Sequence, residues 1–198
     1  MKIIRDYKSD IYTLKNRLLG NCYTAIIGKT KYYFEFEINK NQAKIVFADK
    51  LSIINDIIDE FRKYDQYVNI FYTEDRSFYK AFDEKFTFKL PIEIIQPTKF
   101  FVNKDRLDAI SKYLEDIDVY VPVQIINDEY VLVDGHARLL AKYNEDNKMI
   151  NVYMINENKV LDNLVYIAKE YNIKNVKSLN TLTEDEYNEY IKTISEIE

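Results

Sequence analysis

The residues with the clearest chemical potential lie together in the run VLVDGHAR, residues 131–138. It contains His136, the only histidine of the chain, between Gly135 and Arg138. A strand that ends near Asp134, followed by a helix that starts near His136, would present unpaired backbone N–H groups and the positive end of the helix dipole. Gly135 would let a ligand approach the backbone closely. Such a place suits a phosphate group.

Two charged residues of this run have alternative roles. Arg138 falls in the first turn of the expected helix, where a cation opposes the dipole unless an anion lies nearby, so its place indicates anion recognition. Asp134 is expected to hold Mg²⁺, to orient His136 or to accept a proton from a substrate. The structural alternatives are an ordinary Asp-Gly turn with Asp134 as a helix cap, and an exposed His136 at the helix start. For Arg138 the alternative is a surface ion pair with Asp134 or Glu129.

The neighbouring segments predict the elements that would position this run. A strand is expected at IEIIQP and ends at Pro97, Asn103 is expected to cap a helix, and Pro122 is expected to open the strand PVQII. A turn at 127–129 then leads into the strand YVLVD, the helix HARLLAKYNE and the strand INVYMI. Residues 92–156 therefore predict a β-α-β-β-α-β order.

Residues 1–90 predict a smaller α+β unit, to which the sequence assigns no role. Ser9 is expected to cap a helix that ends at Gly20. Three strand-like runs follow, CYTAIIG, KYYFEFEI and AKIVFA, and they predict a meander. A helix over 51–64, the strand YVNIFYT, a short helix around Phe78 and the strand FTFKL complete the unit.

Residues 157–198 contain no Gly or Pro and predict a helical extension with two helices. Thr183 and Glu186 have the spacing of a capping box at the start of the second helix. The chain is thus expected to be an α+β protein with three domains: the N-terminal unit 1–90, the central domain 91–156 and the helical extension.

Composition and charge exclude several classes of protein. The chain has one cysteine, Cys22, and one histidine, which rules out intramolecular disulfides and Cys-rich or His-rich zinc sites. Cys22 precedes an apolar run and is expected to have no catalytic role. The net charge is −5, with +3 in residues 1–90 and −4 in each of the two later segments, so no basic stripe for nucleic acid is present. Charges interrupt the N-terminal residues, which predicts no signal peptide and no membrane span. A soluble protein of the reducing cytoplasm is expected.

Residues 92–156 resemble the ParB/sulfiredoxin superfamily. The resemblance rests on the I-x-P opening that ends at Pro97, a helix containing Arg106, the strand PVQII, a hairpin, and the run YVLVDGHARLLA at 130–141. It covers about a third of the chain. It implies a compact α+β fold in which the turn at Gly135 and the following helix bind the phosphates of a nucleotide. ParB CTPases that bind DNA, sulfiredoxins and free serine kinases belong to this superfamily.

The departures from each pattern separate these members. Sulfiredoxins have G-C-H-R with an essential cysteine, whereas this chain has His136 and Ala137 there, so the resemblance excludes their activity. Partitioning ParB proteins carry G-E-R-R and a basic helix-turn-helix region, and this sequence has neither. The D-G-H-x-R form is most similar to the D-G-H-H-R of the free serine kinases. Those kinases place a glutamate base after the proline, where this chain has Thr98 and Lys99 after Pro97.

Two hypotheses from different classes follow. In the first, the protein binds a nucleotide (ATP, ADP or CTP) with Mg²⁺, or a phosphorylated small molecule, and its enzymatic forms would be a kinase-like phosphotransferase or a nucleotide hydrolase. Asp134 is then the metal ligand and catalytic residue, and the phosphate contacts are Gly135, His136, Arg138, Lys99 and Thr98.

In the second hypothesis the domain is a non-enzymatic binding or regulatory module. Its acidic helical extension, 157–198, would then bind a protein partner, and the missing glutamate base supports this alternative. DNA binding of the ParB type is disfavoured by the charge distribution.

Overall fold

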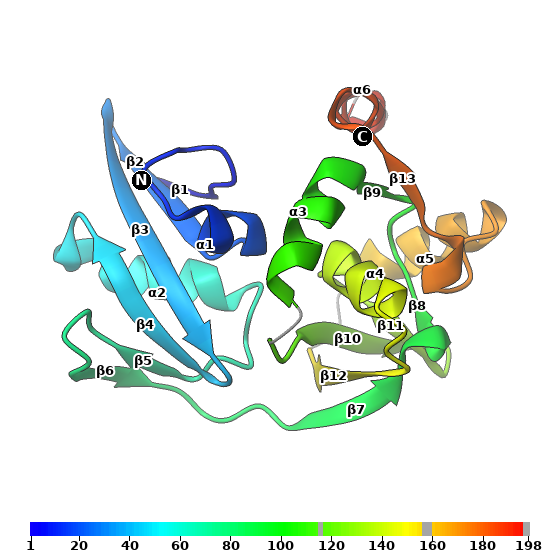
Figure 1. Cartoon of the computed structure of the whole chain (residues 1–198), viewed down its shortest axis with the longest axis horizontal. Helices are drawn as coiled ribbons and strands as arrows, with labels where there is room; N and C mark the ends of the chain where they lie inside the picture. The colour runs from blue at the N-terminus through cyan, green and yellow to red at the C-terminus, as the bar shows by residue number, and fades with distance from the viewer. Residues whose placement is uncertain (115–116, 156–159, 196–198) are drawn as a thin grey trace. The chain divides into compact units, whose positions relative to one another are not determined.

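The structure is a computed structural model that describes residues 1–114, 117–155 and 160–195. The chain divides into two compact units, Met1–Phe86 and Thr87–Glu198, each of which is described by itself (Figure 1). Both units combine helices with a sheet, which confirms the predicted α+β class. The described residues 160–195 belong to the same compact unit as 87–155. The division into three domains at 90 and 156 stays a prediction.

The first unit is built on a six-stranded sheet in the order β1-β2-β3-β4-β5-β6. Neighbouring strands run antiparallel, except for the parallel pair β4 and β5. The meander predicted for the three central runs is confirmed in β2, β3 and β4. The strands are β1 (Lys2–Arg5), β2 (Cys22–Ile27), β3 (Thr30–Asn39), β4 (Gln42–Ala48), β5 (Ile70–Tyr72) and β6 (Phe78–Ala81).

Two helices complete the first unit, α1 (Leu14–Leu19) and α2 (Ile54–Arg62), and the 3₁₀ turn η1 (Leu51–Ile53) leads into α2. Phe61 of α2 contacts Phe36 of β3 and Phe71 of β5, with ring centroids 4.8 and 5.8 Å apart. These buried rings form the core between helix and sheet. The helix expected around Phe78 is wrong, because this aromatic segment pairs with β5 as the edge strand β6.

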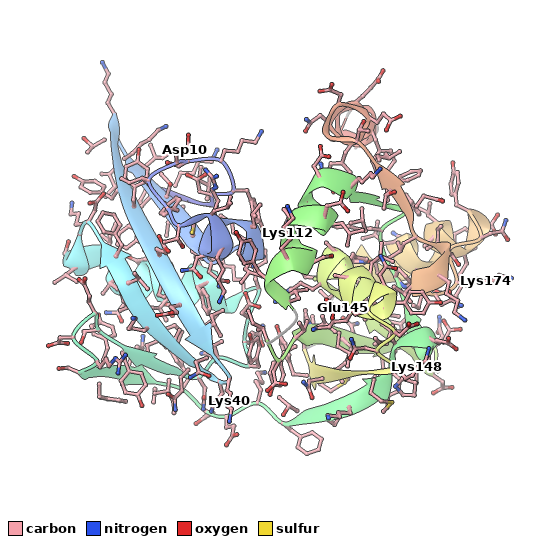
Figure 2. All side chains as sticks on the ribbon, in the orientation of Figure 1. Asp10, Lys40, Lys112, Glu145, Lys148 and Lys174 are labelled. Atoms are coloured by element: carbon pink, nitrogen blue, oxygen red, sulfur yellow. The ribbon has the colours of Figure 1, made fainter. Side chains whose placement is uncertain are left out.

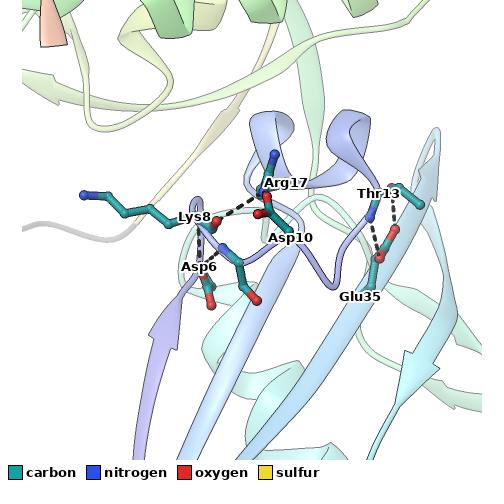
Figure 3. Close-up of polar contacts among 7 residues, drawn as sticks. Asp6, Lys8, Asp10, Thr13, Arg17 and Glu35 are labelled. Carbon is teal, nitrogen blue, oxygen red and sulfur yellow. Dashed lines mark hydrogen bonds and ion pairs between the residues drawn. The ribbon is translucent and has the colours of Figure 1, made fainter.

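The first helix starts later than the sequence predicted. Its N-cap is Thr13, whose hydroxyl accepts a hydrogen bond from the Asn16 N–H, and not Ser9. The Ser9 N–H instead donates to the Asp6 carboxylate at 3.1 Å, within a turn that also uses the Lys8 N–H (Figure 3). The N-terminal segment is thus held by a local turn before the helix begins. Gly20, in the left-handed region, ends the helix as predicted.

The second unit has a five-stranded sheet in the order β7-β12-β10-β11-β8. The central strand β10 runs antiparallel to β11 and parallel to β12, while β8 is parallel to β11 and β7 antiparallel to β12. The hairpin predicted between β10 and β11 is confirmed, but its turn has two residues, Asn127 and Asp128, both with positive φ, and Glu129 already belongs to β11. The strands are β7 (Thr87–Pro91), β8 (Ile95–Gln96), β10 (Tyr120–Ile126), β11 (Glu129–Leu132) and β12 (Met149–Met154).

The expected β-α-β-β-α-β order appears as β8, α3, β10, β11, α4 and β12, with the short strand β9 inserted before α3. The continuous strand expected at IEIIQP is wrong: residues 92–94 form the 3₁₀ turn η2 (Ile92–Ile94), and only β8 pairs with β11. Asn103 caps α3 as predicted, because its Oδ1 accepts from the Arg106 N–H at 2.7 Å. The helices are α3 (Lys104–Leu114) and α4 (His136–Asn144).

Helices cover both faces of this sheet. On one face, Leu161 and Val165 of α5 (Val160–Glu170) pack with Ile126 and Val131. Successive residues of a strand point to opposite faces, so Val121 of β10 points to the other face, where α4 lies. The N-terminal end of α4 therefore sits on the sheet beside the end of β11 (Figure 1).

The C-terminal residues add a small parallel sheet and two further elements to the second unit. Strand β13 (Asn180–Leu182) pairs with β9 (Phe101–Asn103), between the 3₁₀ turn η3 (Val176–Ser178) and α6 (Glu184–Ser195). The capping box predicted for α6 is confirmed, because the Glu186 carboxylate accepts from the Thr183 N–H at 2.9 Å.

The surface of the second unit carries charges of both signs. The exposed side chains of Lys112, Glu145, Lys148 and Lys174 are examples (Figure 2). Within the part of the chain that the structure describes, no helix has the length and apolar character needed to cross a membrane.

Candidate functional site

The motif lies at a strand-to-helix junction, as the sequence predicted. Strand β11 ends at Leu132, and Gly135 is the N-cap of α4 with φ 83°. Its carbonyl accepts the first helical hydrogen bond, from the Leu139 N–H at 2.8 Å. A Cβ at this position would lie 3.0 Å from Val121 Cγ1. Both the left-handed backbone and the close approach of Val121 favour glycine.

The Arg138 side chain folds back over the start of its own helix. Its Nε would lie 3.3 Å from a Cβ built on Gly135, and its Nη2 is 3.9 Å from Asp134 Oδ2. The exposed fractions of these side chains are 12% for Arg138 and 31% for Asp134. Of the two ion-pair partners considered for Arg138, the structure places Asp134 beside it and pairs Glu129 with Lys169. A largely buried guanidinium thus lies against the first peptide of α4.

His136 is buried and not an exposed cap residue, with only 3% of its surface exposed. Its Nε2 accepts a hydrogen bond from the Thr98 N–H at 3.0 Å. The Thr98 hydroxyl, 3.2 Å from the same nitrogen, donates to the Leu132 carbonyl at 2.9 Å. The pKa of His136 is lowered to about 3, first by burial and then by the positive charge of Lys99. The imidazole is therefore neutral at physiological pH.

The second ring nitrogen of His136 carries the proton of this neutral ring, because Nε2 is an acceptor. Among the described residues, this buried Nδ1 has no hydrogen-bond partner. A direct contact between His136 and an anion would therefore have to use Nδ1. The bond through Nε2 already gives His136 a positioning role, since it fixes the loop at Thr98 on the first residue of α4.

The two residues after Pro97 differ in their surroundings. Thr98 is buried, and both its N–H and its hydroxyl are used in bonds within the protein. Lys99 is exposed and close enough to His136 to affect its pKa. Of this pair, Lys99 alone has a side chain directed to solvent and able to approach a ligand.

Asp134 supplies one partly exposed carboxylate at the site. Within the described ranges 1–114, 117–155 and 160–195, no group of three or more His, Cys, Asp or Glu residues could hold a metal ion. Mg²⁺ is commonly held by one or two carboxylates together with the phosphates of a substrate. The single carboxylate of Asp134 fits this second arrangement, in which the phosphate ligand supplies the other oxygen ligands of the magnesium ion.

Sequence reasoning missed the residues that tie the end of α5 to this site. Gln96 is buried in β8, and its Nε2 donates to the Ile173 carbonyl at 2.7 Å and to the Pro97 carbonyl at 2.8 Å. The Phe100 ring contacts the Tyr171 ring at 5.4 Å. A polar Gln inside an apolar run was the one sequence signal of such a bond.

No family model matches the sequence, and no curated protein matches it. Several solved structures are similar to part of the chain, including the following two. Protein Atu1540 from Agrobacterium tumefaciens has a TM-score of 0.38 and 18% identity, covering 48% of this chain and 62% of that one. The C-terminally truncated chromosome-partitioning protein ParB from Caulobacter crescentus, complexed with CTP-gamma-S, has a TM-score of 0.34 and 18% identity, covering 44% and 53%.

These likenesses are partial, because this chain spans less than two thirds of either relative.

Proposed function

We propose that the second unit binds a nucleotide or another phosphate compound at the N-terminal end of α4. The observation that carries this proposal is the arrangement of Gly135 and Arg138. The first N–H groups of an α-helix have no partners within the helix itself, and an N-cap side chain commonly supplies an oxygen acceptor to them. Glycine has no side chain, so Gly135 supplies no such acceptor. The Arg138 guanidinium lies against the same peptide.

The position of Arg138 supports an anionic ligand. A cation in the first turn is repelled by the positive end of the helix dipole, and Arg138 lies there with the Asp134 carboxylate 3.9 Å from its guanidinium. A phosphate group would accept hydrogen bonds from both the guanidinium and the helix N–H groups, and charge-assisted bonds of this kind are strong. The exposed Lys99 would add a further positive charge.

Phosphoryl transfer is the enzymatic form of this proposal. It requires mainly positioning and charge neutralisation, which Arg138 and the helix start would supply to the phosphates. Asp134 would hold Mg²⁺ through the bound phosphates or accept the proton of the attacking hydroxyl. The magnesium ion would supply charge neutralisation on the phosphate oxygens.

The non-enzymatic module is the second candidate, and Thr98 favours it. The free serine kinases resembled by this motif have a glutamate after the proline, whereas the Thr98 hydroxyl is committed to the Leu132 carbonyl. Thr98 is therefore no substitute for the base. In this form the site binds a phosphate ligand and catalyses no reaction. That the acidic helical extension binds a protein partner stays a prediction.

Calorimetric titration tests the proposal. Wild type, Arg138→Ala and the control Lys112→Ala, an exposed cation on α3, are titrated with ATP, ADP, CTP and inorganic tripolyphosphate in the presence of Mg²⁺. CTP is included because the similar ParB structure is complexed with CTP-gamma-S. Loss of a charge-assisted bond of about 1.5–3 kcal/mol predicts a roughly ten- to hundred-fold weaker affinity in Arg138→Ala and no change in Lys112→Ala.

The absence of binding of all four compounds to wild type at millimolar concentration would overturn the proposal. Equal affinities of wild type and Arg138→Ala would remove Arg138 from the site.

A further inference from the structure

Aromatic side chains gather beside the loop that follows Thr98. The Phe100 ring lies 5.4 Å from the ring of Tyr171 and 6.4 Å from that of Tyr190, and Phe101 lies 4.9 Å from Tyr190. Tyr187 joins the cluster through Tyr190 at 6.5 Å. Burial raises the pKa of Tyr190 to about 12, as expected for a phenol that packs among other rings. These rings join the site loop to Tyr171, which directly follows α5, and to α6.

Tyr171 differs from the rest of this cluster in its exposure. Its side chain is 71% exposed, whereas Phe100, Phe101, Tyr187 and Tyr190 are half-buried. Its contact with Phe100 fixes the ring from the protein side and leaves most of the aromatic surface in solvent. A ring held in this way loses little conformational freedom when a planar ligand stacks on it.

Two connections link Tyr171 to the loop that contacts the candidate phosphate site. Phe100 is two residues from Thr98, a span of at most about 7 Å in extended chain, and the Thr98 N–H binds His136 at the first position of α4. From the other side, the Gln96 amide holds the Ile173 carbonyl at 2.7 Å. The segment that carries Tyr171 is thus fixed to the loop that contacts the start of α4.

We propose that Tyr171 is a stacking surface for the base of a nucleotide whose phosphates lie at the N-terminal end of α4. This inference rests on the proposed function and narrows the ligand class from any phosphate compound to a nucleotide. Stacking on an aromatic ring accepts any base, since every base has a π-face. Tyr171 therefore contributes affinity for the nucleoside part and not selectivity between ATP and CTP.

Two substitutions on α5 and just after it provide a matched pair. Tyr171→Ala removes the proposed surface, while Tyr166→Ala removes a tyrosine of α5 with a similar exposed fraction of 66%. Tyr171→Phe keeps the ring and loses the hydroxyl. Because both tyrosines are exposed, all three variants are expected to fold, and circular dichroism with thermal melting checks this.

Each variant is titrated with ATP, CTP and tripolyphosphate in the presence of Mg²⁺. Tyr171→Ala is expected to weaken ATP and CTP by roughly five- to a hundred-fold, the range of base stacking on an aromatic side chain, and to leave tripolyphosphate unchanged. Tyr171→Phe and Tyr166→Ala are expected to bind all three ligands like wild type.

The outcomes separate this inference from the proposed function. If wild type binds tripolyphosphate and the nucleotides, and Tyr171→Ala leaves every affinity unchanged, the stacking role is wrong and the phosphate site remains. An equal loss for tripolyphosphate would also refute the stacking role, because that ligand has no base. If wild type binds none of the three ligands, both proposals fail.

Discussion

The Thr98 N–H donates a 3.0 Å hydrogen bond to His136 Nε2, although the two residues are 38 positions apart in the chain. This bond connects the loop after β8 to the first residue of α4. It uses the acceptor nitrogen of a neutral imidazole and leaves the proton on Nδ1. His136 therefore positions the loop whatever else it does.

Loss of this bond is expected to destabilise the second unit. His136→Leu would fill most of the space but leave the buried Thr98 N–H without its acceptor, which costs about 1–3 kcal/mol. His136→Gln can place an amide oxygen near the same N–H and should cost less. Urea unfolding of both variants measures the two free energies. A His136→Leu variant as stable as wild type would show that the bond contributes nothing.

Protonation of His136 is expected to reduce the stability of the second unit at acidic pH. The pKa of His136 is about 3 in the folded protein and about 6.5 for an unperturbed imidazole. Between these values the unfolded chain binds more protons, so the free energy of unfolding falls as the pH falls from about 6.5 toward 3. The slope due to this group is at most about 1.4 kcal/mol per pH unit.

The measurement is direct because His136 is the only histidine of the chain. Its ring C–H signals in an NMR titration should stay those of a neutral imidazole at pH 5. A midpoint near 6.5 in the folded protein would contradict the buried, neutral assignment. In urea unfolding, His136→Gln should lose this part of the pH dependence.

The sequence predicted the junction at Gly135 and missed the bonds that surround it. The junction depends on local signals: an apolar strand, an Asp-Gly break and an amphipathic helix. The partners of Thr98 and Gln96 depend on contacts between distant segments, which single-sequence patterns do not encode. For the same reason β6 was mistaken for a helix, since the pairing of Phe78 with Tyr72 decides its conformation.

Glu35 of β3 is expected to stabilise the first unit through a buried carboxylate. It accepts hydrogen bonds from the Thr13 N–H at 3.1 Å and the Thr13 hydroxyl at 2.5 Å (Figure 3). It also accepts one from the Asn16 amide at 2.7 Å. Glu35→Ala would leave these donors of α1 without their acceptor, at a cost of roughly 1–3 kcal/mol. Urea unfolding measures the cost, with the exposed Glu74→Ala as control. Equal stability of the two variants would contradict a structural role for Glu35.

Cys22 is expected to resist thiol reagents in the folded protein. Its side chain is fully buried in β2, and burial, together with the nearby negative charge of Glu35, raises the pKa of the thiol. Since the thiolate is the reactive form, labelling should follow unfolding of the first unit. Fast labelling in native buffer would show that Cys22 is accessible. Nucleotide binding abolished by alkylation with the fold intact would contradict its expected lack of a functional role.

Gly135→Ala is expected to destabilise the second unit by more than the cost of placing an L-residue in the left-handed backbone conformation. The left-handed φ of 83° costs an L-residue about 1–2 kcal/mol, and the added Cβ would also press on Val121 Cγ1 at 3.0 Å. Gly28→Ala is a matched control in the first unit, because its φ is 61° and, its two chain neighbours apart, no described residue has an atom within 4 Å of an added Cβ.

The difference between the two costs, measured by urea unfolding of each variant, reports the contact with Val121. Relaxing that contact by adding Val121→Ala to Gly135→Ala should recover part of this difference, although Val121→Ala alone destabilises the core. In calorimetric titrations Gly135→Ala should also weaken tripolyphosphate, because the added methyl group would lie 3.3 Å from Nε of Arg138, the proposed phosphate ligand, and displace its guanidinium. If Gly135→Ala and Gly28→Ala lower the free energy of unfolding equally and ligand affinity is unchanged, neither the packing of Val121 on Gly135 nor ligand binding requires glycine at this position.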